Sequence, residues 1–256
     1  MAKTIPKVEF SVPPLDEYFS VLHSFLNPKK GGWDWSKVIY RGYPQLKQKL
    51  KDVKDEKSRK KKEYQFFKEI FEKERPFLEK SAKHFQREWN KINDGIMLVL
   101  SKVVEQDWPE KDKRIFARVT INPMCPRYIK RRMFDLFYKQ EPKYMESVAI
   151  HEILHFIYFE KWKDVFPEIK EEESDSPHMV WQLSEMVPGV VLNDKRIQKV
   201  FKYKFTSYKK YENFNLNGKP FLSYLQEFYN NKEDFEDFLK KSWEFVKKYE
   251  KEINSI

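Results

Sequence analysis

The sequence predicts an α+β protein that is predominantly helical, with a small antiparallel or mixed sheet packed on one long helix and additional helices at both ends. Two short stretches rich in β-branched and aromatic residues, 114–122 and 131–138, follow each other in the chain and are typical of strands. The segment that opens at Pro142 has an apolar pattern typical of a helix, and it carries the motif 151-HEILH-155. Two adjacent strands that lead into a long helix indicate an α+β core.

The N-terminal part is expected to be extended first and helical afterwards. Residues 1–14 contain three prolines, which disfavour a helix, and a helix is expected over 15–26. The highly charged stretch 45–74 is expected to form a helix with a solvated face, which Pro76 ends. A second long helix is expected over 77–93.

The elements around the motif are less uniform. The apolar run 96–104 is compatible with a strand or a buried helix, because periodicity cannot separate the two over so short a run. After the motif helix, an acidic loop is expected over 167–177, and Ser176-Pro177 is a good N-cap and N1 pair for the next helix. That helix would cover 178–194, with Pro188 kinking or ending it.

The remainder of the chain, from Lys195 on, is expected to be mostly helical. We therefore expect a helical N-terminal region over 1–94, a core over 95–200 that holds the motif, and a C-terminal helical region over 201–256. No linker is clear enough to force a division between them, so the three regions are expected to form one compact unit.

Composition excludes several classes of protein. Glycine is scarce, with 6 in 256 residues, and neither of the Gly-rich phosphate-binding motifs is present. The single cysteine, Cys125, excludes an intramolecular disulfide and fits a reducing compartment. The N-terminus lacks the apolar run of a signal peptide, and no run of apolar residues is long enough to span a membrane, so we expect a cytoplasmic protein. The 50 basic residues against 40 acidic ones favour acidic partners only weakly.

The HEILH motif places three functional side chains close together on one helix. Each helical residue advances by about 100°, so His151 and His155 lie on one side of the helix, one turn apart. Both imidazoles can therefore bind one ion, and zinc accepts imidazole nitrogen and carboxylate oxygen while leaving one position for water. Glu152 lies beside the two histidines, where it can act as the general base that takes a proton from water.

The context of the motif carries a family resemblance. In 148-VAIHEILHFI-157 the flanking and intervening positions are uncharged, and this resembles the active-site helix of zincin metallopeptidases. The metzincin continuation HExxHxxGxxH is broken, because the corresponding positions hold Tyr158 and Lys161. The layout instead resembles the gluzincin type, in which a glutamate from a second helix is the third zinc ligand. The resemblance covers about 114–194, a third of the chain.

Glu185 is the favoured third ligand, because a carboxylate between apolar residues of a helix needs a reason to be there. The other acidic residues of this region stay open as alternatives: Glu171, Glu172, Glu173, Asp175 and Asp194. For the four in the acidic loop, solvated loop charge is the ordinary explanation. His178 lies seven residues before Glu185 on nearly the same helix face. It is an alternative ligand, an oxyanion donor in catalysis, or an ordinary surface histidine.

Two other side chains near the motif have ordinary explanations. Tyr158 extends the ligand face by one turn, but it is favoured as a plain core aromatic residue. Cys125 can be an inhibitory thiolate ligand, although a lone thiol in a proline-rich loop is usually incidental.

The expected function is hydrolysis of peptide bonds by a zinc-dependent metallopeptidase, with a peptide or protein as substrate. The resemblance implies that an extended substrate adds to the edge of the small sheet, so that 114–122 or 131–138 lines the cleft. The alternative is a non-catalytic protein that binds a metal or nucleic acid. In that case the basic segment 46–62 or 202–211 contacts nucleic acid, since 202–211 interleaves aromatic and basic residues.

Overall fold

The computed structural model describes residues 5–27, 34–110 and 113–256, and its backbone contacts divide the chain into two compact units. The first, here called the sheet unit, consists of Val8–Lys91 and Arg114–Ala149. The second, here called the helical unit, consists of Met1–Lys7, Ile92–Lys113 and Ile150–Ile256. Each unit combines segments that are distant in sequence. The organisation into 1–94, 95–200 and 201–256 stays a prediction.

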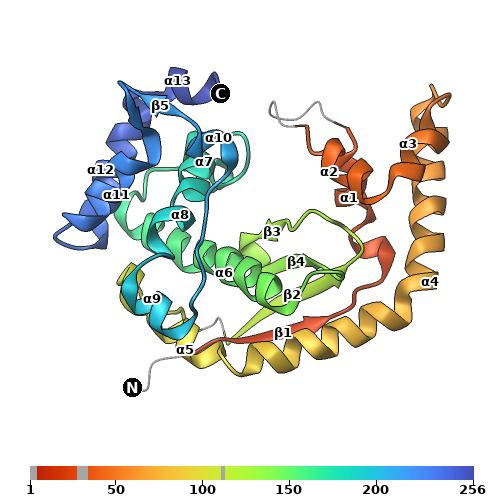
Figure 1. The fold of residues 1–256 in the computed structure, drawn as a ribbon, viewed down its shortest axis with the longest axis horizontal. Coiled ribbons are helices and arrows are strands. Elements are labelled where there is room, and N and C mark those ends of the chain that lie inside the picture. Colours follow the sequence, from red (N-terminus) through yellow and green to blue (C-terminus); the bar gives the residue numbers. More distant parts are fainter. Residues whose placement is uncertain (1–4, 28–33, 111–112) are drawn as a thin grey trace. The chain divides into compact units, whose positions relative to one another are not determined.

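The sheet unit contains a four-stranded mixed sheet in the order β1-β2-β4-β3 (Figure 1). Strands β2 and β4 are parallel, with Phe116 opposite Met133, whereas β3 and β4 are antiparallel. Its elements are β1 (Lys7–Ser11), η1 (Leu15–Glu17), α1 (Phe19–Phe25), α2 (Ser36–Gly42), α3 (Pro44–Leu50), α4 (Glu56–Asn90), β2 (Arg114–Thr120), β3 (Arg127–Tyr128), η2 (Ile129–Arg131) and β4 (Met133–Phe137). The predicted α+β class, mostly helical with a small mixed sheet, is confirmed.

Helix α4 runs continuously through Pro76, so the prediction that Pro76 ends a helix is wrong. Proline removes one backbone hydrogen bond and crowds the preceding turn, which normally bends a helix. Figure 1 shows that α4 bends without breaking. Buried side chains on both sides of the proline, Phe67 before it and Phe85 after it, hold both halves in the core and outweigh the lost hydrogen bond. Asp55 caps the start by accepting from the Ser58 N–H at 2.7 Å.

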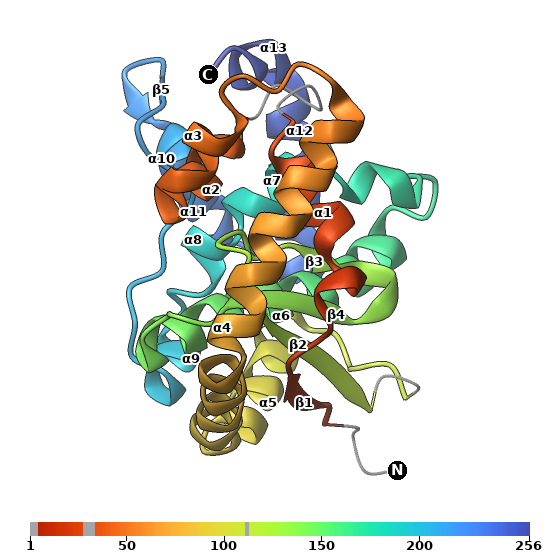
Figure 2. The same cartoon turned by 90° about the vertical axis from the view of Figure 1, so that its right-hand side faces the viewer.

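The helical unit is built almost entirely from helices (Figure 2). Helix α6 begins at Pro142 as predicted, and it contributes residues to both units. The ambiguous run 96–104 is helical. The elements are α5 (Asn93–Val104), α6 (Pro142–Val165), η3 (Glu171–Ser174), α7 (Met179–Met186), α8 (Pro188–Val191), α9 (Lys195–Val200), α10 (Lys209–Glu212), β5 (Asn215–Leu216), β6 (Lys219–Pro220), α11 (Phe221–Asn230), α12 (Phe235–Lys248) and α13 (Glu250–Asn254).

The helix after the acidic loop starts later than predicted. Ser176-Pro177 does not provide its N-cap and N1 residues, and the peptide bond between them is cis. The His178 N–H donates to the Asp175 carbonyl at 3.2 Å, so this part of the chain still forms a turn. Helix α7 begins at Met179, its first buried residue, and Pro188 begins the short helix α8.

Every helix in the described ranges is too short or too polar to cross a membrane.

A buried ion pair connects the two parallel strands of the sheet unit. Arg118 on β2 lies opposite Asp135 on β4, and its guanidinium donates to both carboxylate oxygens at 2.7 and 3.0 Å. Tyr128 receives a further hydrogen bond from Arg118 at 3.0 Å. Burial raises the pKa of Asp135 to about 6, although the hydrogen bonds from Arg118 act in the opposite direction. Because the Asp135 side chain is fully buried, its charge depends on Arg118 for compensation.

We predict that Arg118→Met destabilises the protein by about 3–5 kcal/mol, because it leaves a buried carboxylate without its cation. The double variant Arg118→Met/Asp135→Leu removes both charges, so it should lose clearly less stability than the single variant. Urea unfolding of the three proteins at pH 7 measures the difference. A single variant as stable as the double variant would contradict the assigned role of the pair.

Candidate metal centre

The HEILH motif lies in the part of α6 that is buried on almost every side. From Ala149 to Phe159 every side chain is buried except His151, which is partly exposed. A helix that is apolar on all sides is typical of a position inside a protein core. Glu152 and His155 are therefore polar side chains at positions where the rest of the helix supplies core residues. Such groups are kept in a core only when other groups compensate for their lost hydration.

Helix α7 brings Glu185 to the two histidines of α6. The Glu185 Oε2 atom lies 3.3 Å from the His151 Nε2 atom and 3.8 Å from the His155 Nε2 atom. The two imidazole rings are 4.9 Å apart between centroids. One ligand atom from each of the three residues lies within 4.8 Å of the others. The structure thus brings together the three residues that the sequence predicts as metal ligands.

The three donor atoms suit zinc in both chemistry and spacing. Two ligands at about 2.0–2.1 Å from a tetrahedral zinc ion are themselves about 3.3 Å apart, since the angle at the metal is close to 109°. The two distances from Glu185, 3.3 and 3.8 Å, are close to that value. Two imidazoles and one carboxylate also leave a tetrahedral position open, as in catalytic zinc sites. His151, with a side chain 22 % exposed, is the most accessible member, whereas His155 and Glu185 are almost fully buried.

Glu152 is next to the first histidine but is not part of the three-residue cluster. Only 7 % of its surface is exposed. Its position in the chain turns it about 100° around α6 from His151, so it lies beside the cluster and not within it. This is the placement expected of a general base that acts on a molecule bound at the cluster.

Neighbouring side chains fix the position of helix α7, and few of them could be identified from the sequence. The Ser207 hydroxyl donates to the Glu185 backbone carbonyl at 2.9 Å, and the Tyr211 hydroxyl donates to the Gln182 side chain at 3.0 Å. Burial, and then the nearby charge of Glu185, raises the pKa of Tyr211. Gln182 was one available signal, because it is a polar residue in a mostly apolar helix. Ser207 and Tyr211 come from 202–211, a segment whose interleaved aromatic and basic residues indicated only the nucleic-acid-binding alternative.

Aromatic side chains fill the space beyond the second histidine. The Phe159 ring lies 6.3 Å from the His155 ring at an interplanar angle of 22°. Tyr158 stacks on Trp162, and Trp162 contacts Trp243 of α12 edge to face at 5.4 Å. Tyr158 is therefore part of an aromatic core, the reading that the sequence favoured. This packing excludes water from one side of His155 and keeps its ring in place.

The remaining acidic candidates are not part of the cluster within the described residues. Glu171, Glu172, Glu173 and Asp175 belong to the η3 region, where the Lys170 N–H donates to the Glu173 carboxylate at 3.3 Å. His178 is exposed and stands at the N-cap position of α7, two turns or about 10 Å along the axis from Glu185. Its role as an oxyanion donor stays a prediction. Cys125 accepts a hydrogen bond from Gln140 at 3.5 Å in the sheet unit.

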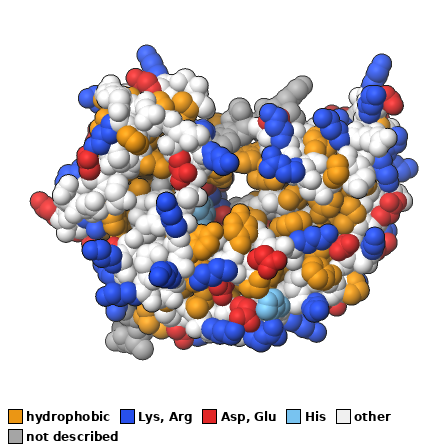
Figure 3. All heavy atoms as spheres, viewed as in Figure 1, with side chains coloured by type: hydrophobic (Ala, Val, Ile, Leu, Met, Phe, Trp, Pro, Cys, Tyr) orange, Lys and Arg blue, Asp and Glu red, His pale blue; other side chains and the backbone are white. Residues whose placement is uncertain are grey.

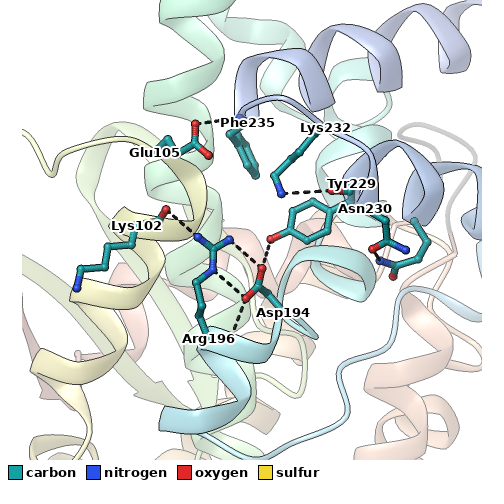
Figure 4. A network of polar contacts seen from close by, with 9 residues as sticks. Lys102, Glu105, Asp194, Arg196, Tyr229, Asn230, Lys232 and Phe235 are labelled. Carbon is teal, nitrogen blue, oxygen red and sulfur yellow. Dashed lines mark hydrogen bonds and ion pairs between the residues drawn. The ribbon is translucent and has the colours of Figure 1, made fainter.

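Asp194 belongs to a different network, which joins three helices (Figure 4). Its carboxylate accepts two hydrogen bonds from the Arg196 side chain, at 2.9 and 3.0 Å, and one from the Tyr229 hydroxyl at 2.7 Å. Arg196 also donates to the Lys102 carbonyl of α5 at 3.5 Å. Burial opposes ionisation, but the hydrogen bonds from Arg196 and Tyr229 outweigh it and hold the pKa of Asp194 well below its usual range. Asp194 therefore connects helices. Within the described residues it is not a member of the metal cluster.

Comparisons with known proteins give no match for the chain, whether against protein-family models, curated proteins or solved structures.

The lowered pKa of Asp194 predicts a pH-dependent loss of stability. A carboxylate with a depressed pKa in the folded state stabilises the protein above its unfolded pKa of about 3.9, and this contribution is lost as the pH falls through the folded pKa. Asp194→Asn should therefore lower the stability at pH 7 by about 1–3 kcal/mol. Its difference from wild type should shrink as the pH is lowered from about 5 towards 2.

Thermal unfolding across this pH range measures the effect, with Asp175→Asn in the exposed loop as the matched control. A difference between Asp194→Asn and wild type that stays constant over the whole range would contradict the assigned network.

Proposed function

We propose that the protein is a zinc-dependent metallopeptidase that hydrolyses peptide bonds in a peptide or protein substrate. The proposal depends on one observation, the convergence of His151 and His155 of α6 with Glu185 of α7. Glu152 lies on α6 next to His151 and is buried. A buried carboxylate from a second helix is what the gluzincin resemblance implies as third ligand. The resemblance itself comes from the residues of the motif and its surroundings.

The residues have separate roles in this proposal. His151, His155 and Glu185 hold the zinc ion through two imidazole nitrogens and one carboxylate oxygen. A zinc ion in such a site supplies Lewis acidity, which makes water nucleophilic near neutral pH and polarises a carbonyl group. Glu152 accepts a proton from the attacking water and delivers it to the departing amine of the peptide bond. The transfer needs no other acid, since one carboxylate can first accept and then donate the proton.

The surroundings of the cluster support these roles. Glu152 is almost fully buried, so water screens its charge only weakly. The aromatic side chains beyond His155 keep the imidazole in one orientation. The hydrogen bond from Ser207 to the Glu185 carbonyl fixes the end of α7 that presents the ligand. A site held from three sides is preorganised, which favours catalysis over loose metal binding.

The direct test replaces the proposed general base while leaving the ligands intact. Glu152→Gln should reduce zinc-dependent cleavage of a mixed library of quenched fluorescent peptides by about a hundredfold or more, because the amide cannot accept the proton. The same variant should retain as much zinc as wild type, as measured by mass spectrometry of metal content. Glu160→Gln, a partly exposed position further along α6, is the matched control and should keep full activity.

Activity in Glu152→Gln equal to wild type would exclude Glu152 as general base. Stoichiometric zinc without cleavage of any peptide, in wild type as in the variant, would instead favour the non-catalytic metal-binding alternative.

A further inference from the structure

The segment between α9 and α10, residues 202–207, is extended (Figures 1 and 2). Two side-chain amides hold it along one edge. Gln198 donates to the Tyr203 carbonyl at 2.6 Å and accepts from the Tyr203 N–H at 3.1 Å. Asn193 makes the same pair of bonds with Phe205, at 2.9 and 3.1 Å. The N–H and C=O groups of Tyr203 and Phe205 thus face the same side, with one residue between them. This alternation is typical of β conformation.

The opposite edge of this segment carries the backbone groups of Lys202, Lys204 and Thr206. In an extended chain these alternate residues point their N–H and C=O groups away from the edge used by Tyr203 and Phe205. All three residues are exposed. Within the described ranges no intramolecular hydrogen bond uses the backbone groups of these three residues. An exposed row of backbone donors and acceptors is a template on which another extended chain can pair.

The charge around this edge is positive. The stretch 195–211 contains seven basic residues and no acidic one. Lys202 and Lys204 belong to the exposed edge itself, and their side chains alternate with the inward-facing residues. On the wider surface, basic and acidic side chains are mixed on the face drawn in Figure 3. Opposite charges across paired strands would favour an acidic partner at this edge.

The edge ends at the helix that presents Glu185. Ser207, the next residue, donates to the Glu185 backbone carbonyl, and Tyr211 donates to Gln182 one turn earlier on α7. A Cβ atom added at Gly189 would lie 3.1 Å from the Ser207 nitrogen, so the segment approaches the start of α8 closely. The hydrogen bond of Ser207 thus connects the end of the edge directly to the backbone of the residue that is the proposed metal ligand.

The burial of aromatic residues in this segment argues against binding of nucleic acid. Phe205 and Tyr211 are buried, and Phe201 is buried as well. The Tyr203 ring packs against Phe201 and Phe205, at 5.9 and 5.1 Å between centroids. Base stacking on a single-stranded nucleic acid needs exposed aromatic faces. The aromatic pattern of 202–211 instead reflects core packing, which leaves the backbone and the lysines as the accessible chemistry.

We infer that Lys202, Lys204 and Thr206 form an edge that binds an extended acidic peptide by backbone pairing, and that this peptide is the substrate segment of the enzyme. The statement that this peptide is the substrate segment rests on the proposed peptidase function. The statement that the edge binds an acidic peptide does not. This edge differs from the expected substrate edge on the four-stranded sheet, because neither β2 nor β4 is an outer strand of that sheet. Substrate peptides are then selected by extended conformation and negative charge, with little demand on other side chains.

The test measures binding separately from cleavage. A fluorescein-labelled peptide of about ten residues, alternating Glu and Val, is titrated with the full chain and followed by fluorescence anisotropy. Lys202→Glu/Lys204→Glu should weaken binding about tenfold or more, because like charges then face each other across the paired backbones. The matched control Lys248→Glu/Lys251→Glu changes the same charge elsewhere on the helical unit and should bind like wild type.

Methylated peptides test the backbone pairing on the wild-type protein alone. Two versions of the peptide carry N-methyl groups on alternate amides, in the two possible phases. One phase should lose binding and the other should keep it, since only every second N–H faces the edge. Equal binding of both versions would overturn the inference, as would unchanged binding to Lys202→Glu/Lys204→Glu. A single-stranded oligonucleotide that binds where the peptide does not would overturn it in favour of nucleic acid.

The outcomes separate this inference from the proposed function. Peptide binding that depends on Lys202, Lys204 and the N-methyl phase, without any zinc-dependent cleavage, would support the peptide-binding edge and contradict the peptidase function. Zinc-dependent cleavage with the same KM in Lys202→Glu/Lys204→Glu and in wild type would keep the peptidase and remove the edge.

Discussion

The burial of the Glu185 carboxylate is the constraint on which the account of the site depends. Only 2 % of this residue is exposed, and it lies in a helix whose other residues are mostly apolar and all buried. Removing a carboxylate from water costs several kcal/mol unless a positive group compensates. The groups that face Glu185 across the helix interface are the His151 and His155 imidazoles. A metal ion shared by all three residues would compensate the charge far more strongly than neutral imidazoles can.

Three other carboxylates, those of buried Asp135 and Glu63 and of partly buried Asp194, are compensated in a different way. Asp135 is paired with the guanidinium of Arg118, and buried Glu63 accepts from Arg59 at 3.0 Å and lies 2.5 Å from the His23 ring. Arginine stays protonated, so these pairs keep their positive charge at any ordinary pH. Asp194 again uses an arginine. Glu185 stands apart because its nearest partners are two histidines, which are the ligands that zinc prefers.

Local patterns were sufficient to predict the strands β2 and β4, the long helix α6 and the cluster itself. Alternating β-branched residues indicated the strands, and a charged residue in an apolar helix indicated Glu185. These signals are confined to a few neighbouring residues, so tertiary packing did not alter them. Pro76 shows the opposite case, because core contacts on both sides kept a helix intact where the local rule predicts its end.

Long-range features could not be predicted from such patterns. The parallel pairing of β2 with β4 depends on the chain between them, and the edge strand β1 comes from a segment far from β2 in sequence. The same holds for Ser207 and Tyr211, which reach α7 from a segment whose composition resembled a nucleic-acid-binding stretch. Alternation of lysine with aromatic residues is compatible with a stacking surface and with a half-buried extended chain. Only the positions of Asn193 and Gln198, which bond the inward-facing residues, distinguish the two.

In the proposed function, Glu185 completes a zinc site with the two histidines of α6. Competition titration with a zinc chelator, on wild type and on Glu185→Ala, tests it most directly, with X-ray absorption at the zinc edge to identify the ligands. The account predicts one zinc per chain, bound by nitrogen and oxygen at about 2.0–2.2 Å without sulfur, and an affinity at least about a hundredfold lower in Glu185→Ala. Equal zinc affinity in the two proteins, or no stoichiometric zinc in wild type, would contradict it.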